Sequence, residues 1–147
     1  MKYVDGDLIG LALMEEVDVI VHGCNCFNTM GAGIAKSIKQ HFPEAYKADC
    51  QTQRGNKKKL GTITFAQCGD VTVVNAYTQF DYSNRGTNAD YNAIRKAFKL
   101  IKEQFSGKRI GLPLIGCGLA GGDWNTVEKI IQEELEGEEV TVVRFRG

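Results

Sequence analysis

The sequence predicts an α/β fold in which a mixed central sheet lies between two layers of helices, a three-layer α/β/α sandwich. Three observations support this prediction. Apolar runs typical of strands alternate along the chain with segments that are apolar at helical spacing. Two of the runs end in glycine-rich turns that open into a helix, as α/β proteins often do. Two other runs, at residues 62–66 and 71–76, flank Gly69-Asp70 as in a β-hairpin, which would make the sheet mixed.

The elements expected from these patterns follow one another without a repeat or a linker, so we predict one domain over residues 1–147. We expect strands at residues 2–5, 17–22, 62–66, 71–76, 109–115 and 140–145, and helices at 34–42, 44–53, 88–105 and 124–135.

Several residues support these boundaries. The run at 17–22 is almost continuously apolar, as in a strand buried on both faces. Pro43 ends the first expected helix because proline cannot continue the hydrogen-bond pattern. Asp123 precedes the last expected helix and can cap it.

Composition limits the function classes. The chain has 18 basic and 18 acidic residues, so its formal net charge is zero, which argues against a dedicated nucleic-acid binder. We interpret the basic run at 54–59 as a solvated loop. The sequence shows neither a secretory signal nor an apolar run near the length of a membrane span, so we expect a cytoplasmic protein without a membrane partner.

The five cysteines form no Cys-x-x-Cys pair, and the chain has only two histidines. A disulfide scaffold and a zinc site are therefore both poor interpretations, and we predict neither a metal nor a cofactor. Reduced, partly buried thiols in a cytoplasmic protein fit better.

The two glycine-rich turns indicate the chemistry of the ligand. The first follows the strand at 17–22 and contains Gly31-Ala32-Gly33, and the second contains Gly116-Cys117-Gly118. Glycine lets backbone N–H groups approach a phosphate, and a helix N-terminus adds a favourable dipole. Two such turns predict a clamp on a diphosphate.

The order of these motifs resembles a macrodomain over nearly the whole chain. The residues that carry the resemblance are Gly6-Asp7-Leu8, Asn25, residues 30–35 and residues 112–119, a combination far more specific than a lone glycine motif. Within that superfamily the chain is similar to the branch that contains terminal ADP-ribose glutamate hydrolases and yeast-type ADP-ribose 1″-phosphate phosphatases. The resemblance implies an ADP-ribose site at the carboxyl ends of the strands.

The resemblance also implies roles for single residues. Asp7 would accept a hydrogen bond from the adenine amine beside the Leu8 backbone, Asn25 would face the distal ribose, and Phe145 is a candidate adenine contact. The first phosphate loop would be Gly31, Ala32, Gly33 and Ile34, and the second Ile115, Gly116, Cys117, Gly118 and Leu119.

The chain also departs from the glutamate hydrolases. Their lysine after the fourth strand is absent from residues 76–79, and Ala120 stands where they have an aspartate. His22 becomes the candidate catalytic residue, as acid, base or nucleophile, with a buried structural histidine as the alternative. Asp81 and Asp123 are reserve acids, although Asp123 is better explained as a helix cap.

We therefore expect a monomer that binds ADP-ribose and dephosphorylates ADP-ribose 1″-phosphate. Two alternatives stay open. One is an ADP-ribose reader without chemistry, and the other is a hydrolase that removes ADP-ribose from modified macromolecules without a lysine.

Overall fold

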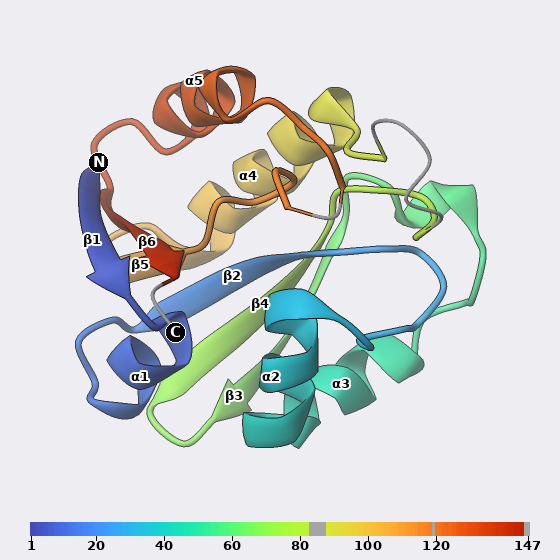
Figure 1. The fold of residues 1–147 in the computed structure, drawn as a ribbon, viewed down its shortest axis with the longest axis horizontal. Coiled ribbons are helices and arrows are strands. Elements are labelled where there is room, and N and C mark those ends of the chain that lie inside the picture. The colour runs from blue at the N-terminus through green and yellow to red at the C-terminus, as the bar shows by residue number, and fades with distance from the viewer. Residues whose placement is uncertain (83–87, 119, 146–147) are drawn as a thin grey trace.

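The computed structural model describes residues 1–82, 88–118 and 120–145, and this part of the chain forms one six-stranded sheet (Figure 1). Its strands lie in the order β1 (Lys2–Gly6), β6 (Glu139–Phe145), β5 (Arg109–Leu112), β2 (Val19–Cys24), β4 (Val71–Tyr77) and β3 (Ile63–Cys68). Each strand pairs in parallel with its neighbours, except that β3 is antiparallel to β4. The predicted mixed sheet and its hairpin are confirmed.

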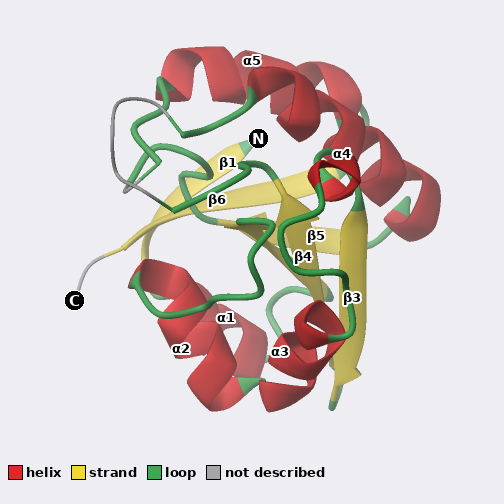
Figure 2. Cartoon of the chain, turned by 90° about the vertical axis from the view of Figure 1, so that its right-hand side faces the viewer, coloured by secondary structure: helices red, strands yellow, loops and turns green. Residues whose placement is uncertain are grey.

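Helices cover both faces of this sheet, as the sandwich prediction requires (Figure 2). One face carries α1 (Leu8–Leu13), α2 (Gly33–His41) and α3 (Pro43–Cys50), and the other carries α4 (Tyr91–Phe105) and α5 (Trp124–Glu134). A short 3₁₀ turn, η1 (Lys57–Lys59), follows α3. In the described part of the chain, no helix combines the length and the apolar character needed to cross a bilayer.

Each helical layer buries its own apolar cluster against the sheet. Under α4 and α5 the fully buried side chains include Phe98 and Ile131. Under α1, α2 and α3 they include Ile20 and Ile38. The sheet is therefore apolar on both faces, which explains the continuous apolar runs of its inner strands.

Some predicted boundaries are wrong, for local reasons. Helix α1 was not expected, because six residues are too short to show a helical period. Helix α4 begins at Tyr91 rather than at residue 88, since the Asp90 side chain caps it by accepting from the Ala93 N–H. Strand β5 ends at Leu112 because Pro113 has no N–H to donate to a ladder.

The prediction that residues 54–59 form a solvated loop is wrong for Lys59. This side chain is only 7% exposed, whereas Lys57 and Lys58 are exposed as expected. Its contacts are described below.

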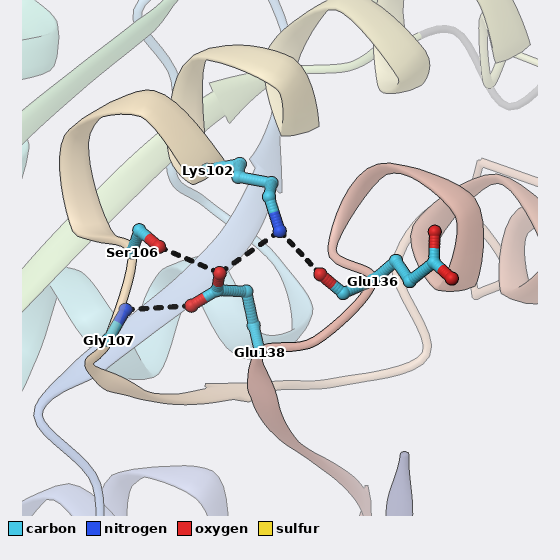
Figure 3. A network of polar contacts seen from close by, with 5 residues as sticks. All are labelled: Lys102, Ser106, Gly107, Glu136 and Glu138. Atoms are coloured by element: carbon cyan, nitrogen blue, oxygen red, sulfur yellow. Dashed lines mark hydrogen bonds and ion pairs between the residues drawn. The ribbon is translucent and has the colours of Figure 1, made fainter.

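A polar network fixes the end of the sheet where β5 and β6 begin (Figure 3). The Glu138 carboxylate accepts hydrogen bonds from the Gly107 N–H at 2.7 Å, from Ser106 Oγ at 2.8 Å and from Lys102 Nζ at 3.0 Å. These donors lower the pKa of Glu138 to about 2, with the backbone N–H contributing most. The network joins the end of α4 to the start of β6 and leaves the opposite, carboxyl end of the strands for a ligand.

Candidate functional site

The candidate site lies where β2 and β5 run side by side. The helix after β2 lies on one face of the sheet and the helix after β5 on the other (Figure 2). Such a switch opens a crevice at the carboxyl ends of the strands. Here the crevice is a cavity of about 450 Å³. Its lining comprises residues 23–25, Thr29, residues 31–35, Gln79, Tyr82, residues 113–116, Gly118 and Ala120.

The lining is neutral. Among the described residues, every side chain that lines the cavity is either apolar or an uncharged polar group, as in Asn25, Thr29, Gln79 and Tyr82. An anionic ligand in this cavity must therefore rely on backbone N–H groups and on the helix dipole.

The first glycine turn supplies such donors at the start of α2. The N-cap residue is Ala32, whose methyl group cannot accept a hydrogen bond from the first helical N–H groups. Gly33 has a φ of 59°, in the left-handed region that favours glycine. A Cβ built on Gly31 or Gly33 would meet no atom within 4 Å, so this backbone faces open space.

The second glycine turn is braced by its own hydrogen bonds, although a Cβ on Gly118, which lines the cavity, would also meet no atom within 4 Å. The Gly122 N–H donates to the Gly116 carbonyl at 2.6 Å, and the Gly121 N–H donates to the Gly118 carbonyl at 3.1 Å. A Cβ on Gly122 would lie 2.5 Å from the Gly116 oxygen, so only glycine fits there. Helix α5, which follows, is capped as predicted: Asp123 Oδ2 accepts from the Thr126 N–H at 3.2 Å.

The predicted ribose residue Asn25 lines the cavity and braces its own loop. Its Nδ2 donates to Thr29 Oγ1 at 2.8 Å, and its Oδ1 accepts from the Phe27 N–H at 2.8 Å. Gln79 lies nearby in the lining and donates through Nε2 to the Asp81 carbonyl at 2.7 Å. Around this loop the lining thus contains the amides of Asn25 and Gln79 and the hydroxyl of Thr29, which are groups suited to a sugar.

The two predicted adenine contacts lie outside the lining but close to each other. Phe145 is 73% exposed and is the register partner of Gly6, the residue before Asp7. Asp7 is exposed and accepts from the Ile9 N–H at 3.1 Å, so it also caps α1. The Leu8 side chain is buried, which leaves its backbone as the part able to face a ligand.

His22, the predicted catalytic residue, does not reach the cavity. Its exposed fraction is 0%, and its Nε2 lies 2.7 Å from Asn75 Oδ1 inside the sheet. Burial lowers the pKa of His22 to about 4, against a smaller opposing effect of the Asn75 hydrogen bond. A neutral imidazole enclosed in the core favours the structural alternative, and the catalytic assignment of His22 stays a prediction.

The thiols near the cavity are poor nucleophiles. Cys24 lines the cavity but is 4% exposed, and burial raises its pKa well above the usual range. Cys117, predicted in the second loop, is not part of the lining, and burial raises its pKa to about 11. Leu119, predicted beside it, lies outside the described residues.

The structure adds site residues that sequence reasoning did not name. Thr29 lines the cavity without belonging to a recognised motif, whereas Pro113 and Leu114 belong to the motif at residues 112–119 but had been given no role in the site. The only sequence signal for Thr29 is its spacing of four residues from Asn25, to which it is bonded.

The comparisons with known proteins agree with this geometry. The family model described as Macro domain matches residues 21–131, a stretch that includes both glycine turns. The chain belongs to the macrodomain family. The resemblance inferred from the motifs is therefore confirmed.

Relatives of this macrodomain match it over at least 90% of its length. It is 34% identical over 152 residues to an uncharacterised 17.5 kDa protein of Enterobacteria phage T4, covering 97% of this chain and 95% of the phage protein. It is 27% identical over 148 residues to an ADP-ribose glycohydrolase of Bos taurus, covering 99% and 90%. It is 25% identical over 144 residues to an ADP-ribose 1″-phosphate phosphatase of Candida albicans, covering 90% and 92%.

A solved structure shares the fold of this macrodomain. A Bacteroides thetaiotaomicron protein of unknown function superposes with a TM-score of 0.78 at 28% identity, covering 97% of this chain and 96% of that one.

Proposed function

We propose that this macrodomain binds ADP-ribose in the cavity and hydrolyses an ADP-ribose derivative. The observation that carries the proposal is the pair of glycine turns that face each other across an uncharged cavity, one of them the uncapped start of α2. Backbone donors and the helix dipole can hold a diphosphate without lysine or arginine.

In this proposal the ligand spans the molecule from Asp7 to Asn25. Asp7 accepts from the adenine amine and Phe145 lies against the adenine ring. The diphosphate lies between residues 31–34 and residues 115–118. Asn25 and Thr29 face the distal ribose, where their amide and hydroxyl groups match its hydroxyls.

The substrate we propose is ADP-ribose 1″-phosphate. It is supported by the full-length similarity to a protein named for this phosphatase activity. In the reaction a water oxygen attacks phosphorus, the bond from phosphorus to the C1″ oxygen breaks, and that oxygen takes up a proton. Since His22 is buried and does not line the cavity, we assign water positioning to the neutral groups of Asn25 and Gln79 together with the ligand's own phosphate oxygens.

A specific observation favours a second candidate, an ADP-ribose reader. Among the described lining residues, none is a carboxylate or a histidine, and burial keeps the Cys24 thiol protonated. Such a lining binds a ligand without offering a side-chain base near neutral pH.

One paired experiment decides between the two. Inorganic phosphate released from ADP-ribose 1″-phosphate is measured beside calorimetric binding of ADP-ribose and AMP. We expect phosphate release and much weaker binding of AMP, which lacks one phosphate and the distal ribose. Tight ADP-ribose binding without phosphate release would identify a reader, and equal affinities for AMP and ADP-ribose would overturn the two-turn clamp. A Gly31→Val variant purified in the same way controls for contaminating phosphatase.

A further inference from the structure

Lys59 is a buried cation close to the cavity but outside its lining. Its side chain is 7% exposed, and its Nζ lies 4.8 Å from the centroid of the Tyr77 ring. Taking an ammonium group out of water costs several kcal/mol unless other groups compensate. The position of Lys59 is therefore maintained by specific contacts.

These contacts are made with the loop that joins β2 to α2. Lys59 Nζ donates to the Cys26 carbonyl at 3.2 Å and to Asn28 Oδ1 at 2.7 Å. Asn28 has a φ of 57°, a left-handed conformation that non-glycine residues seldom adopt. One ammonium group thus holds two acceptors that are two residues apart, across a tight bend of the loop.

The buried side chain of Asp49 belongs to the same network. Asp49 is 1% exposed, and its Oδ1 accepts from the Tyr77 hydroxyl at 2.8 Å, so Asp49 and Lys59 contact the same tyrosine. Thr52 Oγ1 donates to the Asp49 carbonyl at 2.6 Å and lies 3.1 Å from Asn28 Oδ1. The network therefore ties the C-terminal end of α3 to the same bend.

The residues bonded to Lys59 lie between two residues that line the cavity. Cys26 and Asn28 are bonded to Lys59, whereas Asn25 and Thr29 line the cavity on either side of them. Moving the Cys26 carbonyl or the Asn28 backbone would displace Asn25 and Thr29, since they are adjacent in the chain.

We propose that Lys59 is a positioning residue, which holds residues 25–29 from behind so that Asn25 and Thr29 can contact the sugar beyond the diphosphate. The proposal rests on the proposed ADP-ribose site and names the part of the ligand that Lys59 controls. It predicts that Lys59 contributes to selection of ADP-ribose over ADP, which lacks the distal ribose.

The test measures the affinities of ADP-ribose and ADP by calorimetry for Lys59→Met, which keeps the length of the side chain but removes its charge. We expect ADP-ribose to bind about 10-fold more weakly, the effect of one lost charge-assisted hydrogen bond, and ADP to stay within about 2-fold. Lys58→Met is the matched control, because the neighbouring Lys58 side chain is exposed. Both affinities should be unchanged in that control.

A second pair of variants covers the case in which Lys59→Met does not fold. Asn28→Gly keeps the left-handed backbone accessible but removes the acceptor, and should show the same selective loss. Asn28→Asp retains an acceptor for Lys59 and should preserve selectivity. Equal losses for ADP-ribose and ADP, or no loss in Asn28→Gly, would overturn the proposal. If the unmodified protein does not bind ADP-ribose, it is the proposed function that fails.

Discussion

The two glycine turns look alike in sequence but differ in where their backbone hydrogen bonds go. In the first, α2 starts at Gly33 after an alanine N-cap, and the turn glycines face open space. In the second, the N–H groups of Gly121 and Gly122 are already bonded within the turn, and Asp123 caps the helix that follows. The first turn therefore offers an uncapped helix start, whereas the second is braced by hydrogen bonds beyond Gly118, a residue that lines the cavity and at which a Cβ would also meet no atom within 4 Å.

This difference shows that a glycine can serve two opposite purposes in one site. At Gly31 the missing side chain leaves room for a ligand, but at Gly122 it leaves room for the carbonyl of Gly116. Binding should therefore depend chiefly on the first turn, and folding chiefly on the second.

The largest expected effect comes from filling the open space at Gly31 with a side chain. Gly31→Val should weaken ADP-ribose binding at least about 100-fold, or about 2.7 kcal/mol, because its methyl groups fill the space beside the backbone donors. Its free energy of unfolding should stay within about 0.5 kcal/mol of the unmodified protein, since the new Cβ meets no atom within 4 Å. Calorimetry and urea unfolding measure the two quantities.

Gly122→Ala is the counterpart in the second turn. Its Cβ would lie 2.5 Å from the Gly116 oxygen, so we expect a loss of roughly 2–3 kcal/mol in the free energy of unfolding. If Gly31→Val were the less stable of the two variants, the two turns would not differ as described.

Much of the fold could be predicted from the sequence because its signals are local. The continuous apolar run before Cys24 and the alternation on either side of Gly69-Asp70 each identified a strand, and Asp123 identified a helix start. Helix α1 was missed because a helix of six residues shows less than two turns of its period.

The site was less predictable, because side-chain direction and hydrogen-bond partners depend on the tertiary structure. His22 lies near the end of β2 in the sequence, but its ring points to Asn75 on β4 rather than into the cavity. Within three consecutive lysines, nothing in the sequence distinguishes Lys59 from its exposed neighbours. The glycine pattern located both turns but could not tell which one starts an uncapped helix.

The strands that lead into the two turns also differ, and the pH dependence of the free energy of unfolding tests that difference. Strand β2 carries the buried His22, whereas β5 has only apolar residues after Arg109. The pKa of His22 is about 4 in the folded protein, below its ordinary value of 6.5, so the unfolded chain takes up the proton first. The contribution of the neutral, buried His22 to the free energy of unfolding is therefore full above pH 6.5 and is lost as the pH falls toward 4.

We expect this histidine to lower the free energy of unfolding by about 1.6 kcal/mol between pH 6.5 and 5, with a slope that approaches about 1.4 kcal/mol per pH unit below pH 6. His22→Gln cannot titrate and can keep a hydrogen bond to Asn75, so urea unfolding should show a correspondingly weaker pH dependence in this variant. Its phosphate release should persist, since the imidazole does not reach the cavity. Equal pH dependence in both proteins would contradict the lowered pKa of His22, and loss of activity in His22→Gln would support its catalytic role.

A smaller effect should follow from making the first turn resemble the second. Ala32→Asp places a capping carboxylate at the start of α2, as Asp123 does for α5. We expect the free energy of unfolding to rise by about 0.5–1 kcal/mol, because the new side chain can accept from the first helical N–H groups. ADP-ribose binding should weaken about 10-fold or more, since the carboxylate competes with and repels the diphosphate. Ala32→Ser adds a cap without the charge and separates these two causes.

The smallest expected effect comes from the reverse change in the second turn. Asp123 Oδ2 accepts from the Thr126 N–H and from Thr126 Oγ1 at 2.8 Å, so Asp123→Ala removes the cap of α5. We expect a loss of about 1 kcal/mol in the free energy of unfolding, the usual effect of removing a helix cap. Asp123→Asn keeps the cap and should restore most of that stability.

ADP-ribose affinity and phosphate release should be unchanged in both variants, because Asp123 does not line the cavity and the helix that it caps is not the one that faces the ligand. Loss of turnover in both Asp123→Ala and Asp123→Asn, with binding retained, would instead identify Asp123 as the acid of the reaction. The second turn would then be a catalytic element and not only a structural one.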